Sequence, residues 1–259
     1  AELQMVKAPL IHRDPLSSVR FSPAGDLLLS VTVGNEARVW DVETGNPVSP
    51  PFRHLDHIYH ASFDETGRRV ATAGADRLVK VWDLAGASAR VNEWEEESLV
   101  QALAYSPDGK LLAYGMRNGK VIVRDKTSGK VILDGPLEHG GEVVFTLFSP
   151  ESDRLLSTGF GGGAKLWDLS SGNVIHEFEH DDSINFALFN RMGNRLITAS
   201  RDRTAVIWNL ETGEPTLPPV QHNYSVVNAG FSAGGREFAT ASSDNSVYVW
   251  NALSGELVR

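Results

Sequence analysis

The sequence has no cysteine among its 259 residues, which excludes a disulfide framework and every thiolate metal site. It also has no uninterrupted apolar run of about 18 residues, the length that a membrane-spanning helix requires. Its first residues, Ala1, Glu2 and Leu3, lack a signal-peptide pattern, and an initiator methionine is missing. We therefore expect no membrane association, favour a cytoplasmic location, and consider a piece of a longer chain or one subunit of an assembly.

Positive charge is scarce. Lys and Arg number 24 against 33 Asp and Glu, which gives a formal net charge of −9, and no basic cluster is visible. Sequence-independent binding to phosphate backbones or anionic lipid requires a basic face. The charge balance predicts no nucleic acid and no membrane partner, and it favours protein partners or small ligands.

Tryptophan recurs at a fixed period. Trp40, Trp82, Trp167, Trp208 and Trp250 each lie between a Val, Leu or Ile and an Asp or Asn, and Arg124 occupies the one missing position. The successive spacings are 42, 42, 43, 41 and 42 residues. A self-similar period of this length is the mark of a repeat architecture. The chain therefore contains six tandem repeats.

Each repeat carries turn signals and short β-rich runs. A small residue and a glycine follow each tryptophan position, as in Thr44-Gly45, and aromatic-Ser-Pro turns such as Phe21-Ser22-Pro23 precede it. Proline and glycine supply the backbone angles that close hairpins. Runs such as residues 27–33 and 247–250 read as strands, and no helical pattern of useful length is present. Four short strands per repeat bury both faces only by radial stacking, which predicts a single-domain β-propeller.

The repeats resemble the WD40 family over essentially the whole chain. The expected fold is all-β, with six four-stranded blades from repeats of about 12–53, 54–95, 96–138, 139–179, 180–221 and 222–259. Residues 1–11 are predicted to be a closing outer strand, because residues 4–10 align with residues 46–52 and would complete the blade of Trp250. Relatives most often have seven blades, so a seventh supplied by a partner chain or by further sequence stays open beside a closed ring of six.

The resemblance also implies a buried His, Ser/Thr, Asp, Trp tetrad in each blade. Complete sets fall at His54, Thr72, Asp76, Trp82; His180, Thr198, Asp202, Trp208; and His222, Thr240, Asp244, Trp250. Partial sets fall at His12, Ser30, Trp40 and at His139, Ser157, Trp167. These groups offer complementary donors and acceptors, and their repetition indicates a structural element rather than a catalytic site. We expect no catalytic residue, no cofactor and no metal.

The third repeat departs from the pattern, with Glu96, Tyr114, Asn118 and Arg124 at the four positions. A buried guanidinium is costly unless it is paired. Either Arg124 and Glu96 form an ion pair in place of the tetrad, or this blade is loosened for a partner.

Two other patterns suggest ligands but lack the required geometry. His54, His57 and His60 have a spacing of three, which alternates faces on a strand and separates the imidazoles. The glycine-rich residues 159–163 lie in a turn without the helix and the Lys-Ser/Thr of a phosphate loop. The acidic run at residues 93–97 is expected to be a solvated rim, with a docking patch as the alternative.

Partners of WD40 proteins commonly bind the top face, around the mouth of the central channel. The resemblance places top-face positions three and five residues after the His position and one before the Asp position. The partner-binding candidates are therefore His57, Tyr59, Leu99, Gln101, Arg117, Glu142, Val144, Phe160, Asn185, Arg201 and Val227. Tyr, Phe and Arg are the types that most often carry binding energy, which singles out Tyr59, Phe160, Arg117 and Arg201.

The function expected from these features is a non-catalytic scaffold or sensor module for protein–protein interaction. The sequence pattern Thr-Gly-x-Pro-x-x-Pro-Pro in the first and fifth repeats resembles that of WD40 arrays of bacterial signalling proteins. The alternatives are a subunit or domain of a larger enzyme complex and a propeller enzyme that uses the central channel. An enzyme would need an unrepeated cluster of acids, bases or ligands at the axis, and none is visible in the sequence.

Overall fold

The computed structural model describes residues 9–85 and 89–259, which form six antiparallel sheets in chain order. The first three sheets contain β1 (Leu16–Phe21), β2 (Leu27–Thr32), β3 (Glu36–Asp41), β4 (Phe52–Arg53); β5 (Ile58–Phe63), β6 (Arg69–Gly74), β7 (Leu78–Asp83), β8 (Ala89–Glu95); and β9 (Val100–Tyr105), β10 (Leu111–Met116), β11 (Lys120–Asp125), β12 (Leu137–Glu138). The described residues contain no helix, and so none that could cross a membrane.

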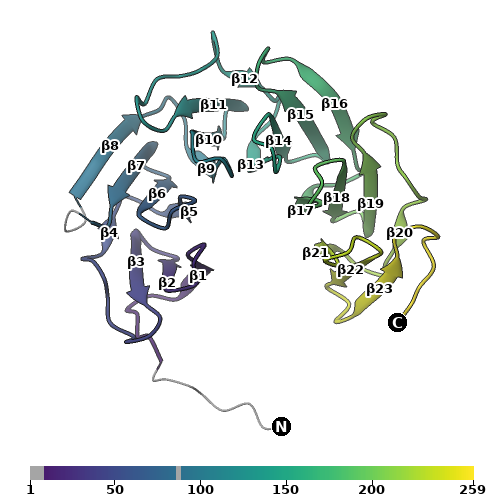
Figure 1. Cartoon of the computed structure of the whole chain (residues 1–259), viewed down its shortest axis with the longest axis horizontal. Coiled ribbons are helices and arrows are strands. Elements are labelled where there is room, and N and C mark those ends of the chain that lie inside the picture. The colour runs from purple at the N-terminus through teal and green to yellow at the C-terminus, as the bar shows by residue number, and fades with distance from the viewer. Residues whose placement is uncertain (1–8, 86–88) are drawn as a thin grey trace.

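The last three sheets repeat the same order. They contain β13 (Val143–Phe148), β14 (Arg154–Gly159), β15 (Gly163–Asp168), β16 (Val174–Glu179); β17 (Ile184–Phe189), β18 (Arg195–Ser200), β19 (Thr204–Asn209), β20 (Val220–Gln221); and β21 (Val226–Phe231), β22 (Glu237–Ser242), β23 (Val247–Asn251). Figure 1 shows the first strand of each sheet near the centre and strands β8, β12, β16 and β20 at the periphery. Each sheet is therefore one propeller blade.

Neighbouring blades pack face to face through apolar side chains. We name the side of a blade that meets the preceding blade its incoming face, and the side that meets the next blade its outgoing face. At the first interface, Val31 and Phe52 of the outgoing face pack with Ile58 and Phe63 of the incoming face. Five such clusters of buried residues correspond to the five interfaces between consecutive blades. The core is thus divided into five layers between the blades.

The blades follow an arc that does not close. Figure 1 shows the first and last blades apart, with an opening between β1 and β21 that is wider than the spacing of neighbouring blades. The described residues thus differ from the closed ring of six that the repeats predicted. The last sheet has three strands rather than the expected four.

The predicted closing strand competes with the chain's own C-terminal residues. Residues 4–7 and 256–259 align with the same residues, 46–49, of the first repeat. Leu257 pairs with Trp250 as Pro47 pairs with Trp40, and the Val258 N–H donates to the Val249 carbonyl at 2.7 Å. The C-terminal residues therefore already pair with part of β23, at the edge where the N-terminal segment was predicted to pair. Residues 1–8 lie outside the described residues, so the pairing of that segment stays a prediction.

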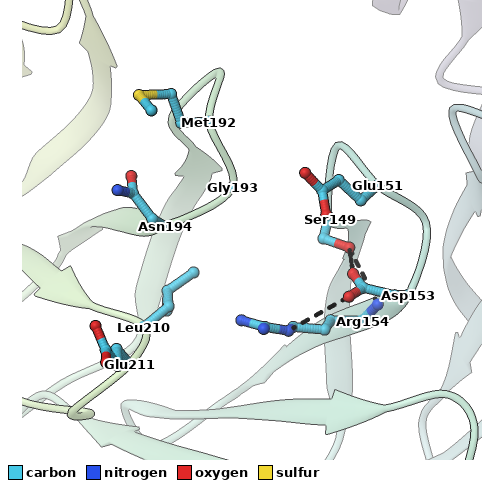
Figure 2. A pocket seen from close by; sticks show the side chains of 9 residues that line it. All are labelled: Ser149, Glu151, Asp153, Arg154, Met192, Gly193, Asn194, Leu210 and Glu211. Carbon is cyan, nitrogen blue, oxygen red and sulfur yellow. Dashed lines mark hydrogen bonds and ion pairs between the residues drawn. The ribbon is translucent and has the colours of Figure 1, made fainter.

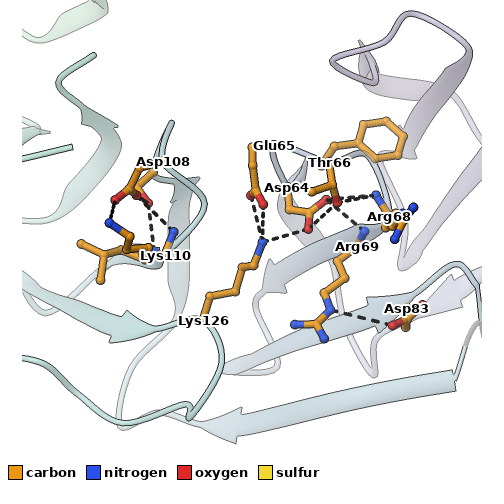
Figure 3. Close-up of polar contacts among 12 residues, drawn as sticks. Asp64, Glu65, Thr66, Arg68, Arg69, Asp83, Asp108, Lys110 and Lys126 are labelled. Atoms are coloured by element: carbon orange, nitrogen blue, oxygen red, sulfur yellow. Dashed lines mark hydrogen bonds and ion pairs between the residues drawn. The ribbon is translucent and has the colours of Figure 1, made fainter. Parts of the chain in front are cut away.

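The interface between the second and third blades contains an ionic contact instead of a purely apolar one. Lys126 lies at the position of Leu84, Leu169 and Leu210, and its Nζ donates to Asp64 at 3.0 Å and to Glu65 at 2.8 Å (Figure 3). The Asp64 side chain is only 2% exposed. Burial alone would raise the pKa of Asp64, but the backbone N–H of Arg69 and the Lys126 ammonium outweigh it and hold the pKa below its usual value.

Replacing Lys126 by methionine is expected to lower the free energy of unfolding by about 1–2 kcal/mol at pH 7, because Asp64 loses its cation while it stays buried. A carboxyl whose pKa is depressed in the folded state stabilises the protein above the unfolded pKa of about 4 and loses this effect as pH falls. The melting temperatures of wild type and variant should therefore converge below about pH 4. The exposed Lys130→Met is the control. Equal stability of Lys126→Met and Lys130→Met at pH 7 would contradict the assigned role.

Candidate interaction surface

One backbone hydrogen bond recurs at the same end of every blade. The N–H of the residue that follows the second strand donates to a carbonyl of the loop that enters the blade. Examples are Phe160 to Glu142 at 3.2 Å and Arg201 to Ser183 at 2.9 Å. The remaining four are Val33 to Pro15, Ala75 to His57, Arg117 to Leu99 and Ser243 to Ser225. These entry loops and turns lie on one side of all six blades, and we call this side the top face. Each bond joins the residue three positions after the tetrad His to the residue one position before the tetrad Asp, which are two of the predicted top-face positions.

A β-bulge recurs in the first strand of every blade. Pairing with the second strand skips Tyr59 in β5 and Val227 in β21, because Ile58 pairs with Gly74 whereas His60 pairs with Ala73. The skipped residues of the other four first strands are Ser17, Gln101, Val144 and Asn185. An extra residue in one strand redirects its side chain and bends the strand. The position five after His is thus the bulge residue in each blade, and the bulge presents it at the top face.

The eleven predicted binding residues share this frame but differ in exposure. His57, Tyr59, Arg117, Phe160, Asn185, Arg201 and Val227 are exposed, and Leu99, Gln101, Glu142 and Val144 are half-buried. Two of the exposed side chains have partners in the neighbouring blade. Asn185 donates to Ser225 Oγ at 2.9 Å, and Arg117 lies 3.7 Å from Glu142. Tyr59, Phe160 and Val227 are 45%, 57% and 44% exposed.

Exposed side chains of the top face that were not predicted from the sequence include Leu55 and Tyr224. Leu55 is 88% exposed and Tyr224 is 62% exposed. They lie one and two residues after the His positions of their entry loops, where the register rule assigned no candidate. An aromatic residue in an entry loop was the signal available in the sequence for Tyr224.

Beneath the top face, the tetrads of the second and fifth blades are complete. His180 lies 2.8 Å from Asp202 through Nδ1 and 2.7 Å from Thr198 through Nε2. The Trp208 indole N–H donates to the same Thr198 hydroxyl at 2.8 Å. His54, Thr72, Asp76 and Trp82 make the same contacts at 2.7–2.9 Å. Since Asp76 also accepts the N–H of Leu55, the network connects the entry loop to the turn after the second strand.

The sixth blade departs from the complete tetrad. His222 bonds Thr240 at 2.7 Å and Trp250 donates to Thr240 at 2.8 Å, but Nδ1 of His222 lies 3.8 Å from Asp244. Nδ1 of His222 and Oδ2 of Asp244 are both buried, and neither atom has a hydrogen-bond partner. The first and fourth blades contain the partial networks of His12, Ser30, Trp40 and of His139, Ser157, Trp167.

Burial sets the protonation of the His54 and His139 imidazoles. Desolvation lowers the pKa of His54 despite the neighbouring Asp76, and it lowers the pKa of His139 to about 4. Burial would raise the pKa of Asp202, but hydrogen bonds from Thr204 and His180 outweigh it and lower the value. At neutral pH the His54 and His139 rings are neutral and Asp202 is ionised. These states suit structural hydrogen bonds.

In the third blade, an ion pair replaces the tetrad. Arg124 donates to Glu96 at 3.0 Å and to the Tyr114 hydroxyl at 2.6 Å, and Tyr114 in turn donates to Glu96. The guanidinium also lies over the Trp94 ring, 5.0 Å from its centroid. Of the two alternatives considered from the sequence, the structure therefore contains the ion pair between Arg124 and Glu96.

The three closely spaced histidines do not converge on one point. Both ring nitrogens of His54 are used within its tetrad, whereas His60 accepts from Arg20 at 2.8 Å and exposed His57 lies beside Asp56. Within residues 9–85 and 89–259, no three His, Asp or Glu side chains are placed to hold a metal ion.

A pocket of about 320 Å³ opens between the fourth and fifth blades, at the end opposite the top face. Figure 2 shows Glu151, Asp153 and Arg154 on one side and Met192 and Glu211 on the other. Arg154 lies 3.8 Å from Asp153, and the lining contains no histidine. The Ser149 hydroxyl of the lining donates to Asp153 at 2.8 Å, and Ser22 and Asp26 make the same turn contact in the first blade, so this pair is a repeated feature of the turns.

Comparison with known families agrees with this architecture. The family described as "WD domain, G-beta repeat" matches residues 7–41, 48–83, 172–209 and 216–251, which together exceed half of the chain. The chain belongs to the WD40 repeat family. The family "Anaphase-promoting complex subunit 4 WD40 domain" also matches residues 68–148.

Individual relatives match parts of the chain. Actin-interacting protein 1 of Drosophila melanogaster is 28% identical over 63% of this chain and 28% of its own length. Eukaryotic translation initiation factor 3 subunit I of Pyricularia oryzae is 27% identical over 65% of this chain and 52% of its own length. Small ribosomal subunit protein RACK1 of Caenorhabditis elegans is 28% identical over 49% of this chain and 38% of its own length. The chain spans about half or less of these relatives.

Among solved structures, the computationally designed Ika8 protein is similar in fold. Its TM-score is 0.84 at 21% identity, and the match covers 96% of this chain but 74% of the designed chain. The arc of six blades thus superimposes on part of a longer chain.

Proposed function

We propose that this chain is a non-catalytic interaction module that binds a protein partner through its top face. One observation carries the proposal: an invariant backbone frame, with one turn-to-loop bond and one bulge in every blade, presents side chains that differ from blade to blade. The repeated positions hold the fold, so specificity belongs to the positions where the repeats differ.

The names of the relatives support a role within an assembly. Two of them are named for assemblies, one as a subunit of a translation initiation factor and one as a protein of the small ribosomal subunit. By this similarity, the chain acts in the cytoplasm as part of a protein complex. Its net charge of −9 favours a protein surface over nucleic acid or anionic lipid as the contact.

Tyr59, Phe160 and Arg201 are the proposed centres of the contact. All three are exposed at the top face, and each comes from a different blade. Aromatic and arginine side chains dominate binding energy when a partner covers them, because they exclude water over a large area. Leu55 and Tyr224 add exposed apolar side chains to the top face at the second and sixth blades.

Truncating Phe160 to alanine is expected to weaken binding of the native partner by about thirty-fold, equivalent to about 2 kcal/mol, without changing the melting temperature. Isothermal titration calorimetry of the full chain measures the affinity. Met192→Ala is the matched control, because Met192 is a 75% exposed apolar residue at the opposite end of the blades. A Phe160→Ala variant that binds as well as Met192→Ala would place the contact elsewhere.

A further inference from the structure

In five of the six blades, a side-chain oxygen lies at the junction between the entry loop and the turn after the second strand. In the second blade, Asp76 accepts the N–H of Leu55 from the entry loop at 2.9 Å and the N–H of Leu78 at 3.2 Å. The other four oxygens belong to Asp14, Asn118, Asp202 and Asp244. The junction is therefore built around an oxygen acceptor.

The fourth blade lacks this acceptor, although residues 137–179 are all described. Its Asp position is Gly161, and no described side chain accepts the N–H groups of Gly140 and Gly163, which match the two donors of the second blade. No atom beyond the chain neighbours lies within 4 Å of the place that a side-chain carbon would take on any of these three glycines. The junction is therefore open where the other blades hold an oxygen.

The chain does not fill this junction with another carboxylate of its own. In the first blade, where the Asp position is also glycine, Asp14 of the entry loop lies beside Gly34 and supplies the oxygen. The residue equivalent to Asp14 in the fourth blade is Gly141. The next residue, Glu142, lies 3.7 Å from Arg117 of the third blade.

The buried imidazole beneath the junction has an unused nitrogen. His139 is only 8% exposed and contacts Ser157 through Nδ1 at 2.9 Å. In the second blade, His54 instead uses Nε2 for the hydroxyl and Nδ1 for the carboxylate. Within the described residues, Nε2 of His139 has no hydrogen-bond partner, and it lies 2.6 Å from the place of a side-chain carbon on Gly159, directly before the turn. A buried polar atom of this kind calls for a partner.

The donors of this junction favour an ionised carboxylate. In the second blade, burial would raise the pKa of Asp76, but hydrogen bonds from the His54 ring and the Leu55 N–H outweigh it and hold the pKa below its usual value. A carboxylate that accepts these groups is thus stabilised in its charged form. Aspartate and glutamate are the side chains that can bring one from outside the chain.

We propose that the top of the fourth blade binds the carboxylate of an aspartate or glutamate side chain of the partner, which accepts the N–H groups of Gly140 and Gly163 in place of the missing Asp. The exposed Phe160 ring of the same turn packs against neighbouring residues of the partner. The identity of the occupant as a partner side chain rests on the proposed top-face function, whereas the carboxylate site itself does not.

Titration of the full chain with sodium acetate tests the site, because acetate has the carboxylate and the adjoining carbon of an aspartate side chain. NMR spectra should show saturable shifts of the Gly140 and Gly163 amide signals and of the His139 ring nitrogens. Sodium chloride at the same ionic strength and neutral acetamide are the controls. Shifts that are absent, that do not saturate or that chloride reproduces would overturn the site. Equal shifts with acetamide would overturn the preference for an acidic side chain.

Replacing Gly141 by aspartate should fill the site from within, as Asp14 does in the first blade. Gly141 lies outside the left-handed region, and the nearest atom to the added carbon is the Phe160 carbonyl oxygen at 3.9 Å, so the fold accommodates the change. The variant should lose the acetate response and bind the native partner at least about ten-fold more weakly, since charge-assisted hydrogen bonds are lost. Gly135→Asp adds the same charge at an exposed glycine and is the control.

The two variants of the top face separate this proposal from the proposed function. Normal partner binding by Gly141→Asp together with weakened binding by Phe160→Ala would overturn the acidic contact and leave the top-face function standing. Normal binding by both variants would overturn the top-face function as well. An acetate response that persists in Gly141→Asp would show that acetate binds elsewhere and would overturn the site.

Discussion

Replacing Thr198 by valine is expected to lower the free energy of unfolding by about 3 kcal/mol. The Thr198 hydroxyl is fully buried and bonds both the His180 ring and the Trp208 indole N–H. Valine has nearly the same shape but leaves two buried polar groups unsatisfied, at about 1–3 kcal/mol each. For a chain of this size the melting temperature should fall by roughly 10 °C, as measured by calorimetry.

Exposed Thr127→Val is the matched control for the lost hydroxyl and should change stability little. A comparison of two aspartates adds a second check. Asp202→Ala should destabilise more than Asp244→Ala, because the His180–Asp202 contact is 2.8 Å whereas the His222–Asp244 separation is 3.8 Å. An equal loss of stability in the two variants would show that the hydrogen bond between His180 and Asp202 does not stabilise the fold.

Replacing Glu96 by alanine is expected to destabilise the third blade by about 3 kcal/mol. The Arg124 and Glu96 side chains are only 15% and 12% exposed, and removal of one partner from such a pair leaves an uncompensated charge. The Tyr114 hydroxyl loses its acceptor in the same variant. Urea denaturation of the full chain measures the loss.

The control is Glu97→Ala, which removes the neighbouring carboxylate, itself 56% exposed. The double variant Glu96→Ala, Arg124→Leu removes both charges and should cost less than the sum of the single variants. Strict additivity of the two single costs would show that Arg124 and Glu96 are not coupled.

The repeat period predicted the local structure because each repeat contains its own turns and strands. It identified the six blades, and its register led to Thr198 and Trp208, which share a hydrogen bond in the fifth blade. The same register found Tyr59 and Val227 without revealing that a β-bulge presents them. A bulge is a feature of strand pairing, and a single strand's sequence does not show it.

The interfaces between blades were harder to predict. Lys126 replaces the usual leucine, but its partners Asp64 and Glu65 lie more than sixty positions earlier. The opening of the arc depends on a small rotation at each interface that accumulates over the blades. Whether the first and last blades meet is thus a property of the whole arc, which the 42-residue spacing does not report.

The most direct test of a top-face binding function compares the triple variant Tyr59→Ala, Phe160→Ala, Arg201→Ala with wild type for affinity to the native partner and for melting temperature. The proposal predicts loss of binding by well over a hundred-fold with an unchanged melting curve, since all three side chains are exposed. Unimpaired binding by a stably folded triple variant would contradict it, and the partner would then have to contact the sides, the ends or the opposite face of the arc.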